Sequence, residues 1–155
     1  MKVGILVQYK NNNDGIQSVV FSIHQQLYSV LIEEVVEILR VPMITTVPGI
    51  NAIIEGVINL RGNIIPVVSL HKRFQLEEPV KHKKNRIVIV QVNNEHIGLI
   101  VEDVRMVTNF DEDDVEPPYN QDITEDVFIG FAKLDDQVIG ILNLQKVLYP
   151  QDESN

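Results

Sequence analysis

The chain repeats its own pattern of residue types, and this internal repeat constrains the fold more than any other feature. A shift of 74 residues places Gly56 on Gly130, and a shift of 69 residues places Glu33-Glu34 on Glu102-Asp103. Further matched positions are Leu60 with Leu134, Ile65 with Ile139, Val67 with Ile141, Leu70 with Leu144, Lys72 with Lys146, Phe21 with Val90 and Val30 with Leu99. Because glycine, acidic and lysine positions agree as well as apolar ones, we expect two copies of one structural unit.

Each copy is predicted to consist mainly of short strands. Segments 19–23 and 87–90 are rich in β-branched residues, and polar turn-forming residues follow each of them. Segments 57–60 and 64–68 flank a short polar connection, which predicts a hairpin with a positive φ at Gly62. Helical patterns are confined to residues 32–39 and to residues 143–148, where Asn143 can cap the helix. We therefore expect an all-β fold.

The repeat and the composition also predict the domain boundaries. We expect an N-terminal segment at 1–17, a two-part domain at 18–148 and a tail at 149–155. The first β-barrel is expected mainly from 18–76 and the second mainly from 86–148, since closure into barrels hides strand edges. Two polar stretches are expected to be connections: 77–85, and the acidic stretch 109–124, which contains two consecutive prolines and predicts a long surface loop.

Charge and composition exclude several classes of function. With 13 basic and 22 acidic residues the net charge is −9, which disfavours nucleic-acid binding. The basic residues cluster once, and a lysine-rich connector ahead of a strand explains this cluster: Lys72, Arg73, Lys81, Lys83, Lys84 and Arg86. No cysteine is present to form a disulfide or a thiolate site. The sequence contains no run of 18 apolar residues, the length that would predict a membrane helix. We therefore expect a cytoplasmic protein without direct membrane insertion.

No motif for catalysis, for a metal or for a cofactor is evident. The four histidines, His24, His71, His82 and His96, lack the i, i+4 spacing of a helical zinc site. The acidic run 111–114 lacks the turn glycine of a calcium loop, and Val115 occupies a ligand position. Glycine-rich phosphate loops and nucleophile elbows are absent. A catalytic site assembled from distant residues stays open, but the sequence gives no reason to propose one.

The first hairpin differs from its internal counterpart in residues that look specialised. Asp135-Asp136 replace Arg61-Gly62, and Gly140 replaces Pro66. Because the repeated unit tolerates another turn, Arg61, Gly62 and Pro66 are expected to serve something that only the first copy does. Pro66 lacks a backbone donor, which predicts an edge or irregular strand position. Arg61 can pair bidentately with a carboxylate, although an idle arginine on an exposed turn is the alternative.

These residues carry a resemblance to a known family. The run Asn59-Leu60-Arg61-Gly62, followed by Pro66-Val67, Leu70 and Phe74, resembles the central signature of the CheW-like domain family. The resemblance extends over roughly 18–148, and Ser69 stands where the family usually has an aspartate, which we expect to alter local hydrogen bonding. It implies two intertwined five-stranded SH3-like β-barrels, a short helix after the opening hairpin and a C-terminal helix.

The resemblance also implies a function. Members of the family act in chemotaxis as adaptors that join the cytoplasmic tips of methyl-accepting chemoreceptors to the regulatory domain of the histidine kinase CheA, without catalysis. This chain would then be a monomer in isolation that is recruited to membrane-associated arrays. A module of a CheV-type or non-flagellar system is the alternative, and a small β-barrel enzyme is a more distant one.

The resemblance further implies two binding surfaces. The receptor would bind at the junction of the two barrels, where we expect Val35, Glu37, Gly56, Asn59, Arg61, Val88, Val104 and Val107. CheA would bind the first barrel around Ile44, Val47, Ile50 and Ile53, although valine and isoleucine are more often core residues. We also expect Arg61 to pair with Glu37 and so to hold the edge of the first barrel in its docking shape.

Overall fold

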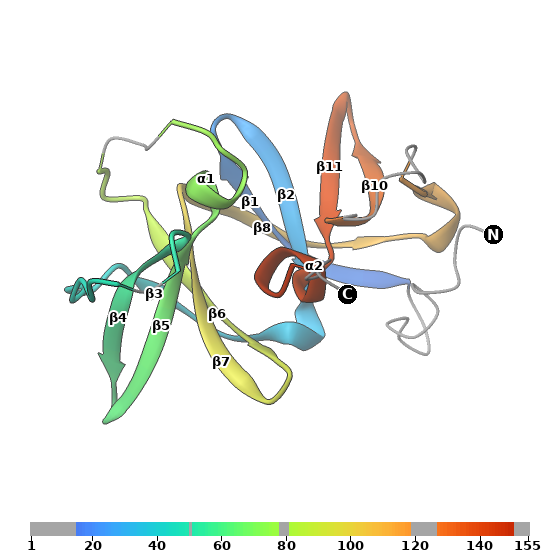
Figure 1. Cartoon of the computed structure of the whole chain (residues 1–155). Helices are drawn as coiled ribbons and strands as arrows, with labels where there is room; N and C mark the ends of the chain where they lie inside the picture. The colour runs from blue at the N-terminus through green and yellow to red at the C-terminus, as the bar shows by residue number, and fades with distance from the viewer. Residues whose placement is uncertain (1–14, 50, 78–80, 119–126, 151–155) are drawn as a thin grey trace. The chain divides into compact units, whose positions relative to one another are not determined.

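The structure, a computed structural model, describes residues 15–49, 51–77, 81–118 and 127–150. It confirms the all-β prediction, because strands dominate and the helices are short (Figure 1). The strands form two sheets, one in each of two compact units. Among the described residues, no helix is long and apolar enough to cross a membrane.

One unit consists mainly of residues 34–104. Its five strands are β3 (Val35–Arg40), β4 (Ile54–Leu60), β5 (Asn63–Ser69), β6 (Arg86–Val92) and β7 (Glu95–Val101), arranged in the order β3-β6-β7-β5-β4. Helix α1 (Leu70–Arg73) follows β5. The chain beyond β3 returns to the opposite edge of the sheet, where Thr45 bridges Val57 on β4. The backbone of these two residues exchanges two hydrogen bonds of 2.9 Å, so the sheet closes on itself.

The other unit is assembled from residues 15–20, 26–33 and those from 105 onward. Its sheet has the order β8-β1-β2-β11-β10-β9. The strands are β1 (Ile16–Ile23), β2 (Gln26–Leu31), β8 (Asp103–Phe110), β9 (Val115–Glu116), β10 (Phe128–Leu134) and β11 (Gln137–Leu142), and helix α2 (Leu144–Leu148) follows them. The two-residue strand β9 pairs with β10 as Thr45 pairs with β4.

The two sheets repeat one topology, as the internal repeat predicts. Under the two shifts, β8-β1-β2-β11-β10 corresponds strand by strand to β3-β6-β7-β5-β4. A parallel pairing in each sheet corresponds as well: Val67 lies opposite Gly98 on β7, and Ile141 lies opposite Ser29 on β2. Residue types repeated along the sequence therefore mark equivalent positions in space.

The opening hairpins are exchanged between the units. β1 and β2 join the sheet of β10 and β11, whereas β6 and β7 lie between β3 and β5. This grouping differs from the expected barrels at 18–76 and 86–148. The pattern within a hairpin could not reveal the exchange, because both sheets offer an equivalent neighbour and the choice depends on pairing between distant segments.

Each unit has its own apolar core. In the unit of residues 34–104, the core consists of Ile58, Ile65, Val67, Ile87 and Ile89, with Leu39, Ile44, Leu60 and Ile100 packed against it. In the other unit, the core consists of Ile16, Val20, Leu27, Leu31, Phe110, Val115, Ile129, Ala132, Ile139 and Ile141. Along β5, β6 and β11 these core positions alternate, as the period of two in a strand requires.

The hairpin turns are short and use left-handed backbone conformations. Gly62 has φ +89°, which confirms the predicted positive φ, and its neighbour Arg61 has φ +51°. The same geometry occurs at His24-Gln25 and at Asn93-Asn94. Two consecutive residues with positive φ match the twist of the strands on either side.

Two local predictions were wrong. The helix expected over 32–39 is only a three-residue 3₁₀ turn, Ile32–Glu34, after which β3 begins. In its described part, 109–118, the loop expected over 109–124 begins with the end of β8 and contains Val115, which is fully buried in the core, and residues 119–124 lie outside the described residues. Both errors have one cause, since tertiary packing decided segments whose local patterns favoured another conformation. The C-terminal helix at Leu144–Leu148 is confirmed, with Asn143 as its cap.

Candidate functional site

Arg61 and Glu37 form the most distinctive polar contact of the first hairpin. The Nη2 atom of Arg61 donates to Oε1 of Glu37 at 2.5 Å, and Nη1 donates to Oε2 at 3.3 Å. The predicted pairing is therefore present in this structure, and it is bidentate. It joins the β4–β5 turn to β3, two parts that belong to opposite edges of the five-stranded sheet. The pair thus acts at the same closure of the sheet as the bridge between Thr45 and Val57.

The electrostatics of the pair favour its charged form. Hydrogen bonding to Arg61 lowers the pKa of the Glu37 carboxyl from its ordinary value of 4.5, an effect that burial opposes and the charge of Arg61 reinforces. The same hydrogen bond raises the pKa of Arg61. The Arg61 side chain is 68% exposed and that of Glu37 is 27% exposed, so the pair is accessible to a partner.

The turn that carries Arg61 is ordered by its own hydrogen bond. Asn59 is exposed, and its Oδ1 atom accepts a hydrogen bond from the backbone N–H of Gly62 at 2.9 Å. Arginine is an uncommon choice at a φ of +51°, where asparagine, aspartate or glycine is favoured. Asp135 meets that preference at the corresponding turn, with φ +56°. The first hairpin thus carries at this position a residue that the backbone conformation disfavours, and its side chain reaches Glu37.

Pro66 was expected at an edge or an irregular position, but it lies in regular register on β5, a strand between β4 and β7. It stands opposite Val57 on β4, but the parallel pairing of β5 with β7 begins only at the next residue, Val67. The missing backbone donor therefore falls just outside that ladder. Pro66 is half-buried and so contributes to the wall of the unit more than to its surface.

Gly56 is needed for close packing of the backbone and does not present a surface. A Cβ atom at this position would lie 2.3 Å from the carbonyl oxygen of Thr45. At the corresponding Gly130, a Cβ atom would lie 2.7 Å from the carbonyl oxygen of Glu116. Both glycines follow a register shift in their strand. Their recurrence therefore has a structural cause, and Gly56 is removed from the residues expected to touch a receptor.

The other residues expected at the receptor surface differ in exposure. Val88 is fully buried on β6, so its side chain cannot contact a partner directly, and that assignment is corrected. A run of alternating isoleucine and valine could not reveal this burial. Val35 and Val104 are half-buried, and Val107, which lies on β8 in the other unit, is 56% exposed.

Exposed apolar residues that the sequence did not single out lie on β3 and in the first hairpin, the two elements that carry this pair. β3 alternates between half-buried and exposed positions, and Val36 and Ile38 are 46% and 39% exposed. Ile64, which lies opposite Asn59 in the first hairpin, is 64% exposed. The helical interpretation of 32–39 hid the first two, because it placed Val36 on the inner face together with Val35. The β-branched run Val35-Val36 was the available signal for a strand.

The residues expected to face CheA are mostly half-buried. Ile44 packs against the core of its unit, and Val47 and Ile53 have intermediate exposure. Ile50 lies outside the described residues. Two neighbours are more accessible: Val41 is 38% exposed and Met43 is 86% exposed. The first apolar side chains that a partner meets here are therefore Val41 and Met43.

A buried histidine fastens the end of the same unit. His71 on α1 is 1% exposed, and its Nε2 atom lies 2.6 Å from Oε2 of Glu102. The same oxygen accepts a hydrogen bond from the backbone N–H of His24, and the backbone carbonyl of Glu102 accepts one from Asn85. Glu102 thus connects α1, the β1–β2 turn and the connector before β6. Within the described part of the chain, no three His, Asp or Glu side chains gather in a way that could hold a metal ion.

Ser69, which stands where the family usually has an aspartate, caps helix α1. Its hydroxyl accepts a hydrogen bond from the backbone N–H of Lys72 at 3.1 Å, at the start of α1. Asn143 accepts from Lys146 in the same way at the start of α2. Serine, asparagine and aspartate are all good N-cap residues, so the departure at Ser69 leaves the cap intact.

Comparison with known proteins assigns this architecture to one family. Residues 17–151 match the CheW-like domain. The chemotaxis protein CheW of Treponema pallidum is 33% identical over 111 residues, which is 69% of this chain and 65% of that protein's length. The chemotaxis protein CheW of Bacillus subtilis is 30% identical over 86% of this chain and 87% of its own. The crystal structure of the scaffolding protein TtCheW from Thermoanaerobacter tengcongensis has a TM-score of 0.81 and 38% identity, and the match covers 91% of each chain.

Proposed function

The chain belongs to the CheW-like domain family, and on this premise we propose that it is a chemotaxis adaptor that couples chemoreceptors to the histidine kinase CheA by binding alone. The observation that carries the proposal to particular residues is the ion pair between Arg61 and Glu37. It stands on an exposed turn in a strained conformation, and the internal repeat has no counterpart for it.

The receptor-binding surface is built around this pair. Val35, Asn59 and Val104 stay in the proposed surface, and Val107, which belongs to the other unit, is proposed as a receptor contact from the family resemblance alone. The exposed Val36 and Ile38 of β3 are added to the surface. Apolar side chains supply the buried area of such an interface, and a few charges fix its register. The receptor partner is the cytoplasmic tip of a methyl-accepting chemoreceptor. Gly56 and Val88 support this surface from behind, by close packing and burial.

The kinase-binding surface lies on the unit of residues 34–104. Ile44, Val47 and Ile53 support the segments that border it, and Ile50 is proposed with them from the family resemblance. The partner there is the regulatory domain of CheA. Binding to both proteins recruits this chain to membrane-associated receptor arrays.

The proposal is tested by co-sedimentation of the full chain with CheA and a receptor cytoplasmic fragment in vesicle-bound arrays. Wild-type protein is expected to enter a ternary assembly, and Arg61→Ala is expected to lower receptor binding about tenfold or more. Lys133→Ala, an exposed cation on β10, is the matched control and should bind as wild type does. A folded wild-type sample that forms no assembly would overturn the proposed function. Wild-type binding by Arg61→Ala would overturn the role given to the ion pair.

A further inference from the structure

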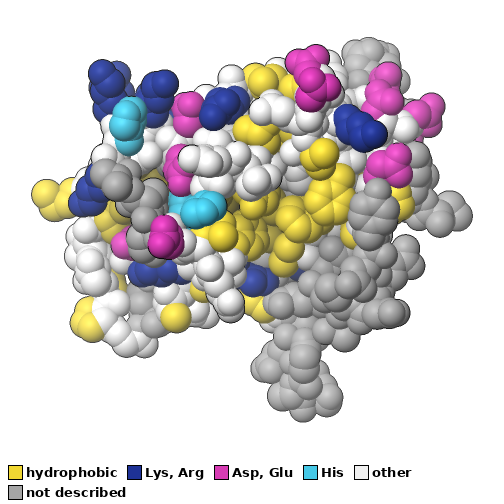
Figure 2. All heavy atoms as spheres, turned by 90° about the horizontal axis from the view of Figure 1, so that it is seen from above, with side chains coloured by type: hydrophobic (Ala, Val, Ile, Leu, Met, Phe, Trp, Pro, Cys, Tyr) yellow, Lys and Arg dark blue, Asp and Glu magenta, His cyan; other side chains and the backbone are white. Residues whose placement is uncertain are grey.

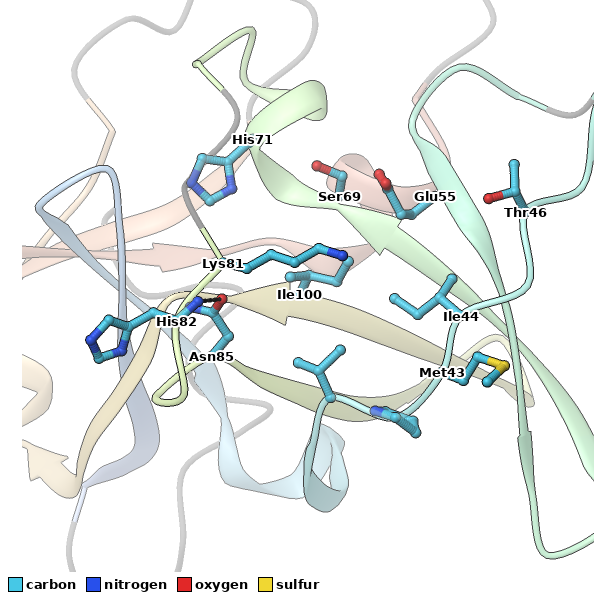
Figure 3. A pocket seen from close by; sticks show the side chains of 12 residues that line it. Met43, Ile44, Thr46, Glu55, Ser69, His71, Lys81, His82, Asn85 and Ile100 are labelled. Atoms are coloured by element: carbon cyan, nitrogen blue, oxygen red, sulfur yellow. Dashed lines mark hydrogen bonds between the residues drawn. The ribbon is translucent and has the colours of Figure 1, made fainter.

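A hollow of about 540 Å³ opens on the unit of residues 34–104, apart from the Arg61–Glu37 pair. Residues 41–44 and Thr46 line one side of it, and the connector residues Lys81, His82 and Asn85 line another. Glu55, Ser69, His71 and Ile100 complete it. In Figure 3 the side chain of Lys81 extends into the hollow below Ser69 and Glu55, while Ile44 faces it from the other side. The hollow thus combines an apolar wall with a cation.

The charges around the hollow leave it positive. Glu55 is compensated, because the Nζ atom of Lys72 lies 3.1 Å from its Oε1 atom. His71 is engaged with Glu102. Lys81 is exposed and has no carboxylate within ion-pair distance among the described residues. The ammonium group of Lys81 is therefore the uncompensated charge of the hollow.

The cations beside the hollow extend this positive field. Lys83 and Lys84 are exposed on the same connector and, in the part of the chain that the structure describes, neither pairs with a carboxylate. Figure 2 shows Lys and Arg side chains gathered beside a histidine on one face. Although the chain as a whole has a net charge of −9, these cations create a local positive field that attracts negative groups. A partner with carboxylate side chains would therefore bind here more favourably than a neutral or basic one.

The rim of the hollow supplies apolar contact. Met43 is 86% exposed and in Figure 3 points outward, and Val41 beside it is 38% exposed. Exposed large apolar side chains in one stretch mark sites of protein–protein contact, and methionine adapts its shape to different partner surfaces. A small anionic ligand would leave Met43 uncovered, whereas a protein segment would cover it.

We propose that this hollow docks an acidic segment of a partner protein in which aspartate or glutamate side chains alternate with apolar ones. An acidic side chain pairs with Lys81 inside the hollow, and apolar neighbours cover Met43 and Val41. Lys83 and Lys84 attract the segment from a distance and raise the association rate. The assignment of the segment to CheA rests on the proposed function, since Ile44 belongs both to this hollow and to the proposed kinase surface.

The test measures binding of full-length CheA and of a receptor cytoplasmic fragment to wild type, Lys81→Glu and Lys133→Glu. Both substitutions reverse one exposed lysine, so they change the net charge equally. Lys81→Glu is expected to weaken CheA binding about tenfold at ~50 mM salt and much less at ~300 mM salt, because salt screens exposed charges. Lys133→Glu should bind CheA as wild type does. Met43→Ser is expected to weaken CheA binding at both salt concentrations, with Val138→Ser, also an exposed apolar residue, as its control.

The outcomes separate this inference from the proposed function. If wild type binds CheA and Lys81→Glu binds it equally well at low salt, the docking inference is overturned and the adaptor function stands. Loss of receptor binding alone in Lys81→Glu would also overturn the inference, since the segment would not belong to the kinase. If wild type binds neither partner, the proposed function itself fails. Far-ultraviolet circular dichroism of each variant checks that the fold is retained.

Discussion

At the scale of single residues, the first hairpin places a costly conformation and a functional side chain at the same position. Arg61 adopts φ +51°, where its side chain brings no conformational advantage, and it uses that position to reach Glu37. Strain of this kind persists where the surrounding structure fixes it, and it clusters at binding sites. The bidentate geometry explains why a lysine at position 61 would not be equivalent, since lysine offers a point charge and no planar fork.

Removing the guanidinium is expected to change the titration of Glu37. In wild type the pKa of the Glu37 carboxyl lies below its ordinary value of 4.5 because of the hydrogen bond to Arg61, and Arg61→Ala should return it towards that value. Carbon-detected NMR titration of the glutamate carboxyls measures both pKa values. Lys133→Ala should leave the Glu37 titration unchanged.

The sign of the accompanying pH effect follows from linkage. A carboxyl whose pKa is lowered on folding adds stability above its unfolded pKa, and this stability is lost as pH falls through the folded pKa. The difference in unfolding free energy between wild type and Arg61→Ala should therefore be present at neutral pH and shrink below pH 4.5. Urea unfolding at pH 7 and at acidic pH measures it. An equal difference at both pH values would contradict the assigned role of the ion pair.

At the scale of elements, each sheet closes where a glycine lets a neighbouring backbone approach. Gly56→Ala is expected to destabilise the protein by about 1–3 kcal/mol, because the added methyl group would overlap the carbonyl of Thr45. The substitution should also loosen the pairing of Thr45 with β4. Hydrogen exchange should then rise at the N–H groups of Thr45 and Val57, each of which donates to the carbonyl of the other residue. Urea unfolding and hydrogen exchange measure the two effects.

Gly62→Ala is the control for that prediction. The position has open space around it, and the added methyl group strains only a turn with φ +89°. It should cost some stability but leave the amides of Thr45 and Val57 protected. If the two variants raise exchange at these amides equally, close packing is not the reason for Gly56.

The elements that the sequence predicted are those set by local chemistry. The hairpin around Gly62 and the cap at Asn143 depend on residues that are adjacent in the sequence. The helix predicted over 32–39 was wrong because its apolar spacing fits the period of a helix as well as that of a strand. Pairing with β6 decides for the strand. The burial of Val115 was missed because one apolar residue within an acidic stretch shows no periodic pattern. The prediction that Val88 contacts a receptor was wrong because a continuous run of β-branched residues does not show which side chains the fold buries.

The sequence predicted the charged residues of the candidate site but not the exposure of its apolar residues. The pair of Arg61 and Glu37 could be expected from the family signature and from the missing counterpart at Asp135. The exposure of Val36, Ile38 and Met43 could not, since it depends on the side of a strand or on the path of a connection. Residue identity thus indicated which charges would pair, and the three-dimensional structure showed which apolar groups are exposed.

At the scale of the whole molecule, the exchanged hairpins predict which fragments can fold. A fragment of residues 34–104 contains all five strands of its sheet, whereas 18–76 lacks β6 and β7, the two strands between β3 and β5. We expect dispersed amide signals in the NMR spectrum of the first fragment and a collapsed, unfolded spectrum from the second. A folded 18–76 fragment would show that its hairpin can replace β6 and β7, contrary to the observed topology.

The same exchange suggests how such a chain arose. Each repeated half supplies its opening hairpin to the sheet of the other half, so a polypeptide of half the length could complete a sheet only by borrowing the hairpin of a second copy. The simplest ancestor is therefore a homodimer with swapped hairpins whose single gene was duplicated and fused in tandem. Fusion makes that association intramolecular, and its completion no longer depends on protein concentration. The two halves were then free to diverge, and today one of them has an arginine at its turn and the other an aspartate.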